Sequence, residues 1–127
     1  MSQRVMDHPY PHNLICAVAG EDIPQEALPP DFEESVEYVL ENLLDQCESY
    51  MLVLRYMRGM SNREIGAFYG LTTQRVRQLL DKALRRLRHP SRHKYLVSGC
   101  AQNGPLPPRR EDRPALGAML TELPYLN

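Results

Sequence analysis

A row of hydrogen-bonding side chains between residues 72 and 79 suits the recognition of nucleic-acid bases. Arginine can bridge guanine O6 and N7, and glutamine can pair with adenine N6 and N7, with each good pair contributing about 1–3 kcal/mol of discrimination. The candidates for base recognition are Thr73, Gln74, Arg75, Arg77 and Gln78. No nucleophile, metal-binding cluster or phosphate loop stands out in the sequence, so we expect neither an enzyme nor a bound cofactor.

A second group of polar and basic residues suits contact with the phosphate backbone. The group consists of Asn62, Arg63, Thr72, Lys82, Arg85, Arg86, Arg88 and Arg92. The net charge of -1 hides a strong polarity, because residues 1–57 carry two basic residues against eleven acids, while residues 58–94 carry ten against two. The basic segment favours double-stranded DNA as a partner, whereas the acidic segment suits solubility or a protein partner, or could fold back on the basic helix.

Two short helices are predicted to position these side chains. Ser61 to Glu64 forms a capping-box pattern that starts the first helix, and Gly70 ends it. Thr72 then caps a second helix, whose apolar residues recur at helical spacing: Val76, Leu79, Leu80, Ala83, Leu84 and Leu87. This pair has the dimensions of a helix-turn-helix, with the base-reading row turned outward.

The inside of the predicted helix-turn-helix should be filled by a small apolar cluster. Its expected members are Ile65, Tyr69, Leu71, Val76 and Leu79. Gly66 lies on the first helix, where the absence of a side chain would allow a close approach of the second helix.

The rest of the chain predicts further helices and no second domain. Asp31 is placed to cap a helix that starts at Phe32, and another helix around Met51 should end at Arg58 and Gly59. The stretch from residue 14 to residue 19 fits either a turn of helix or a strand. We therefore expect an all-α fold, a small helical bundle that contains the helix-turn-helix at residues 31–97. A proline-containing, irregular N-terminal extension covers 1–30, and 98–127 is expected to be a disordered tail.

Cysteine and histidine spacing give no sign of a metal site, and hydropathy gives no sign of a membrane segment. Cys16, Cys47 and Cys100 lie far apart without a CxxC motif, and Cys47 is expected to be a small core residue. His89 and His93 have helical spacing, but Pro90 interrupts the helix between them. No apolar run approaches the ~20 residues of a membrane span. These features predict a soluble cytoplasmic protein that holds no metal.

The run from Gly70 to Leu79, continued by KALRRLRHPSR at residues 82–92, resembles region 4 of the sigma-70 family of bacterial RNA polymerase sigma factors. The resemblance covers roughly residues 32–96. It implies a helix-turn-helix that reads a promoter element in the major groove and contacts the β flap of the RNA polymerase core. By position, Thr73, Gln74, Arg77 and Gln78 would face bases, while Asn62, Arg63 and Lys82 would face phosphates.

The chain also departs from the sigma-factor pattern. Where the family usually has Arg then Glu, this chain has Thr73 then Gln74, which implies a different DNA target. We see no aromatic-rich region 2, which sigma factors use to melt DNA, so we expect either a separate region 2-like subunit as a partner or a role as an accessory regulator at the polymerase.

Two other functions fit the same sequence. One is a stand-alone helix-turn-helix regulator of the response-regulator type, and the other is a polymerase-binding interaction module with little affinity for DNA.

Overall fold

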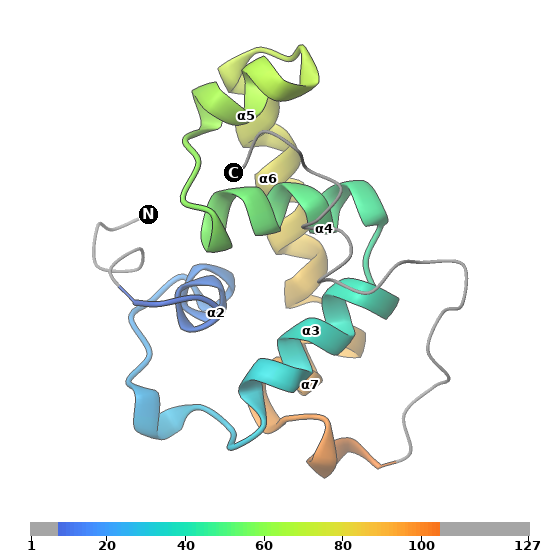
Figure 1. The fold of residues 1–127 in the computed structure, drawn as a ribbon. Helices are drawn as coiled ribbons and strands as arrows, with labels where there is room; N and C mark the ends of the chain where they lie inside the picture. Colours follow the sequence, from blue (N-terminus) through green and yellow to red (C-terminus); the bar gives the residue numbers. More distant parts are fainter. Residues whose placement is uncertain (1–7, 105–127) are drawn as a thin grey trace.

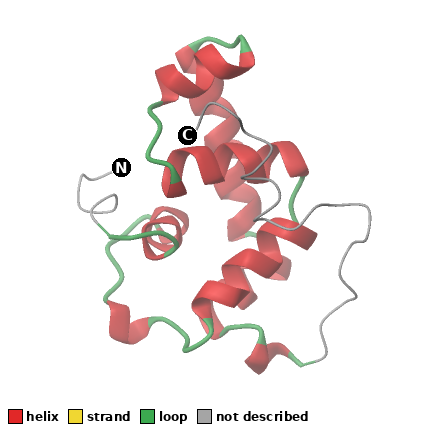
Figure 2. Ribbon diagram, in the orientation of Figure 1, coloured by secondary structure: helices red, strands yellow, loops and turns green. Residues whose placement is uncertain are grey.

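The computed structural model describes residues 8–104, and it builds them from α-helices with no strand in that range (Figures 1 and 2). The α-helices are α2 (His12–Ala19), α3 (Phe32–Asn42), α4 (Gln46–Leu52), α5 (Asn62–Tyr69), α6 (Thr73–Arg88) and α7 (Pro90–Ser98). Short turns η1 (Gln25–Ala27) and η3 (Ala101–Asn103) are 3-10 helical, and η2 (Val53–Met57) is a π-helical turn. The structure confirms the predicted all-α bundle. Residues 105–127 of the predicted tail lie outside the described residues.

One apolar core joins the described helices. Side chains from α2, α3, α4, η2, α5 and α6 are almost completely buried in it, with Leu14, Leu40, Leu52, Leu54, Ile65 and Leu87 among the largest. The last helix, α7, adds Tyr95 and Leu96 to the same cluster. The helix-turn-helix is therefore the projecting part of a larger packed unit.

The stretch that fitted either a helix or a strand forms α2. Nearly all of α2 is buried, from His12 to Val18. The Asn13 side-chain amide also donates a hydrogen bond of 2.9 Å to the carbonyl oxygen of Tyr56, which lies 43 residues later in the sequence. The boundaries at 30 and 97 stay predictions, but α2 shares its core with the helices of residues 31–97.

The start of α3 differs in one detail from the prediction. Asp31 occupies the N-cap position, yet its side chain makes no capping hydrogen bond. Its carboxylate accepts a hydrogen bond of 3.0 Å from the backbone N–H of Ala101 instead. Ser35, one turn into α3, accepts a bond of 2.9 Å from the backbone N–H of Cys100. The acid thus ties α3 to the segment after α7.

The helix around Met51 starts at Gln46 and continues through the π-helical turn η2. It ends as predicted at Arg58, and Gly59 follows with a φ of 70°. Cys47 is exposed, so its prediction as a core residue is wrong. The reason is that α4 turns Glu48 and Ser49 inward, and the Ser49 hydroxyl donates to the carbonyl oxygen of Leu40 at 2.6 Å.

The helices α5 and α6 project from one end of the bundle, and the C-terminal half of α6 runs back between its neighbours (Figure 1). Besides α5, the elements packed against α6 include α2, α4 and α7. The helix α6 therefore connects the projecting helix-turn-helix to the apolar core. No helix within residues 8–104 is long and apolar enough to cross a membrane.

Candidate nucleic-acid interface

Hydrogen bonds at two helix starts fix the shape of the helix-turn-helix. The Ser61 hydroxyl accepts from the backbone N–H of Glu64 at 3.1 Å, and the Glu64 carboxylate accepts from the backbone N–H of Ser61 at 3.0 Å. These bonds hold the pKa of Glu64 below its ordinary value. The Thr72 hydroxyl accepts from the backbone N–H of Arg75 at 3.1 Å. The predicted capping box and N-cap are both confirmed.

The turn between α5 and α6 depends on two glycines. Gly70 ends α5 with a φ of 71°, which a residue with a side chain rarely adopts. A Cβ atom on Gly66 would lie 2.6 Å from the carbonyl oxygen of Leu71. The predicted close approach therefore occurs, but it is made by the backbone of the turn just before α6.

One face of α6 is buried as its apolar spacing predicted. Val76, Leu80, Ala83, Leu84 and Leu87 lie in the core. Ile65 of α5 is completely buried beside them, and Tyr69 and Leu79 are half-buried. Leu71 is exposed, so its prediction as a member of the inner apolar cluster is wrong. The tight turn places the backbone of Leu71, rather than its side chain, against α5.

The five residues predicted to read bases are all exposed. They form the outer side of the first turns of α6: Thr73, Gln74, Arg75, Arg77 and Gln78. A long contact of 3.5 Å joins the Arg75 guanidinium to the amide oxygen of Gln78. Within residues 8–104, Arg77 has no hydrogen-bond or ion-pair partner. The arrangement offers donors and acceptors from one rigid helix, which is the geometry that major-groove recognition requires.

The residues predicted to contact phosphates divide into two groups. The side chains of Arg63, Thr72, Lys82 and Arg85 are exposed, and Asn62 is half-buried in the first turn of α5. They lie in the first turn of α5, at the N-cap of α6 and on α6 itself, whereas the residues predicted to read bases all lie on α6.

The other three arginines have partners inside the molecule. Arg86 forms an ion pair with the mostly buried Glu48, with 3.2 Å between Nε and Oε2. Arg88 donates to the carbonyl oxygens of Val18 at 2.6 Å and Ala17 at 3.2 Å. Arg92 donates to the carbonyl oxygens of Leu43 at 2.8 Å and Arg86 at 3.3 Å.

The sequence does not predict these partners of Arg86, Arg88 and Arg92. Carbonyl groups carry no sequence signal, and 49 to 71 residues separate Arg88 and Arg92 from the carbonyls of α2 and Leu43 that they reach. Arg88 and Arg92 therefore tie helix ends together, whatever else their guanidinium groups contact.

Part of the chain is similar in sequence to known proteins. Residues 42–89 match the family model described as "Sigma-70, region 4". The chain is 43% identical over 70 residues to the RNA polymerase sigma factor SigA of Listeria monocytogenes, and the match to SigA of Listeria innocua has the same identity and length. Each match covers 50% of this chain but 18% of the sigma factor. No solved structure matches the chain.

Proposed function

We propose that this chain, which carries a sigma-70 region 4-like helix-turn-helix at residues 42–89, binds double-stranded DNA with the start of α6 in the major groove. The observation that carries the proposal is the exposed row of polar side chains on α6, opposite a buried apolar face. Arg77 and the two glutamines can form paired hydrogen bonds with purine edges, so the binding would be sequence-specific.

Contacts to phosphates would hold α5 and α6 in register on the duplex. Arg63 at the start of α5 and Lys82 and Arg85 on the exposed side of α6 are the cations best placed for this role. Arg86, Arg88 and Arg92 would contribute less, because their guanidinium groups already have partners within the protein.

The relatives also suggest a protein partner. Both matched proteins are RNA polymerase sigma factors, and the family-model match at residues 42–89 begins at the last residue of α3 and covers α4, α5 and α6. We therefore propose the RNA polymerase core, through its β flap, as the partner that would bring this chain to a promoter in the cytoplasm. A separate region 2-like subunit would supply promoter opening in such a complex.

A second function is favoured by the internal arginine partners. With three of the predicted phosphate-binding residues engaged elsewhere, the chain could act as a polymerase-binding module with little affinity for DNA. Such a protein would compete with sigma factors for the flap.

Selection of duplexes from a random pool, with and without RNA polymerase core, distinguishes the two functions. Sequence-specific DNA binding predicts that a single motif is enriched and that core increases its recovery. Tight binding to core without enrichment of any motif at low salt would favour the second function and contradict the first.

A further inference from the structure

Three residues that can bind metals lie close together in α2 and just before it. His8, His12 and Cys16 follow one another at four-residue intervals, and their ligand atoms all lie within 4.8 Å of one another. His12 and Cys16 share one side of α2 because residues four apart are neighbours on a helix. His8 lies just before the helix, and its ring stacks on that of His12 with 3.9 Å between centroids.

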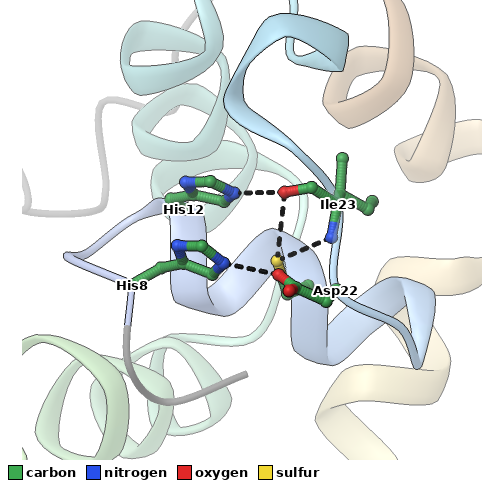
Figure 3. A network of polar contacts seen from close by, with 5 residues as sticks. His8, His12, Asp22 and Ile23 are labelled. Carbon is green, nitrogen blue, oxygen red and sulfur yellow. Dashed lines mark hydrogen bonds and ion pairs between the residues drawn. The ribbon is translucent and has the colours of Figure 1, made fainter. Parts of the chain in front are cut away.

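The loop after α2 brings further ligand atoms to the same place (Figure 3). Asp22 accepts a hydrogen bond of 2.5 Å from Nε2 of His8. The carbonyl oxygen of Ile23 lies 2.6 Å from Nε2 of His12, and the backbone N–H of Ile23 donates to the Cys16 sulfur at 3.4 Å. Two imidazoles and one thiol therefore converge on one small volume, and the Asp22 carboxylate borders it through its contact with His8.

The site is closed on one side and open on the other. Cys16 is completely buried and His12 is 5% exposed, whereas the side chains of His8 and Asp22 keep 30% and 42% of their surface exposed. The buried ligands would hold a fixed geometry, and the exposed pair leaves a path for an ion to enter.

We propose that His8, His12, Cys16 and Asp22 form a binding site for a divalent transition-metal ion, with Zn²⁺ the best fit. Zn²⁺ takes four nitrogen, sulfur and carboxylate ligands in a tetrahedron, and this set supplies all three types. Bond lengths of about 2.0–2.3 Å place tetrahedral ligand atoms roughly 3.3–3.8 Å apart. The stacked rings of His8 and His12 would have to rotate relative to each other, so that both nitrogen lone pairs point at the ion. Binding of the ion would release the Cys16 thiol proton to solvent, and each imidazole would bind through its nitrogen that carries no proton.

A bound ion would act on the fold, separately from the proposed DNA interface. It would cross-link α2 to the loop at residues 20–24. Arg88 at the end of α6 is bonded to the carbonyl oxygens of Ala17 and Val18, so α2 is also an anchor for α6. Metal binding would therefore stabilise α2, which anchors the C-terminal end of α6.

Sequence reasoning missed this site because it looked for CxxC spacing and for the His89 and His93 pair. The repeated four-residue interval from His8 to Cys16 is present in the sequence. The fourth ligand was not visible, because only the fold returns Asp22 to the start of α2.

Metal titration of the full chain tests the proposal. Zn²⁺ affinity and stoichiometry are measured by competition with a chromophoric chelator, and Co²⁺ is used as a spectroscopic probe of a thiolate ligand. We expect one Zn²⁺ per chain, a higher Tm with Zn²⁺, and a sulfur-to-cobalt charge-transfer band that is absent in Cys16→Ser.

Two exposed ligands allow variants that leave the core intact. His8→Ala and Asp22→Asn should each weaken Zn²⁺ binding at least about tenfold. His93→Ala and Cys47→Ser are the matched controls and should bind as the wild type does. The proposal is overturned if His8→Ala and Asp22→Asn bind Zn²⁺ as tightly as the wild type, or if Cys47→Ser abolishes the cobalt band.

Discussion

At the scale of residues, the two sides of α6 have separate roles. Apolar side chains hold the helix in the core, and the polar side chains opposite them are left for a ligand. Among those, Arg77 has no hydrogen-bond or ion-pair partner within the described part of the chain. It is therefore the residue whose removal should affect recognition with the least effect on the fold.

Arg77→Ala should weaken binding to the selected duplex by about 1–3 kcal/mol and change binding to a scrambled duplex much less. The physical reason is the loss of a paired hydrogen bond to a base edge. Fluorescence anisotropy with both duplexes measures the two affinities at one salt concentration. Equal losses for both duplexes would mean that Arg77 contacts only the backbone.

Lys82→Ala should behave differently, because in the proposed complex its exposed ammonium on α6 would contact phosphate without reading sequence. We expect weaker binding to all duplexes, and a plot of log affinity against log salt whose slope falls by about one. Lys94→Ala removes the same charge from α7 and should leave the slope unchanged. A slope that responds equally to both variants would show that the interface is not centred on α6.

The outward residues of α6 were predictable from the sequence, whereas the fates of its last arginines were not. Apolar spacing alone orients a helix, so the burial of Val76, Leu80 and Ala83 predicted the exposure of Thr73, Gln74, Arg77 and Gln78 on the opposite side. Arg88 and Arg92 bond to carbonyl groups that the fold brings near, and no pattern of residue types records such partners.

At the scale of elements, helix boundaries followed from local chemistry. As the sequence predicted, Ser61 and Thr72 cap helices and Gly59 follows a helix end. These features were predictable because caps and helix ends depend on neighbouring residues. Asp31 was the exception, since its carboxylate is used by a segment 70 residues away. The helical state of α2 also depends on tertiary packing, which the six-residue apolar stretch at residues 14–19 does not reveal.

Gly66→Ala tests the contact between α5 and the turn. In an open helix this change stabilises by about 0.5–1 kcal/mol. Here the new Cβ would meet the carbonyl oxygen of Leu71, which is backbone and cannot move freely, so we expect a loss of about 1–3 kcal/mol. Urea unfolding measures it, and a gain in stability would show that the turn is looser than described.

Thr72→Ala removes the N-cap of α6. The backbone N–H of Arg75 loses its acceptor, and the free energy of unfolding should fall by about 1 kcal/mol. Thr73→Ala is the control, because Thr73 is the first residue within α6 and does not cap it. Equal effects of the two changes on thermal unfolding would contradict the assignment of the cap.

At the scale of the whole molecule, the helix-turn-helix depends on a support built from both ends of the described chain. Arg88 spans 70 residues to reach the carbonyl oxygen of Val18 in α2. Core side chains of α2 and α7 lie in the same cluster as those of α5 and α6. The predicted boundary between residues 30 and 31 therefore does not correspond to a gap in the packing of residues 8–104.

Arg88→Ala should lower the free energy of unfolding by about 1–3 kcal/mol, because two part-buried carbonyl groups lose their charged donor. Arg85→Ala is the matched variant on the exposed side of the same helix. It should weaken DNA binding while leaving stability nearly unchanged. Similar stability losses in both variants would argue against the role of Arg88 as a link to α2.

The first turns of α6 are proposed to read DNA sequence. Exchange of two of the residues proposed to contact bases tests this proposal most directly. The double variant Thr73→Arg with Gln74→Glu restores the residue types usual in sigma factors at these two positions. We expect duplex selection with this variant to enrich a motif that differs from the wild-type motif at adjacent base pairs and matches it elsewhere. Recovery of the same motif by both proteins would contradict the claim.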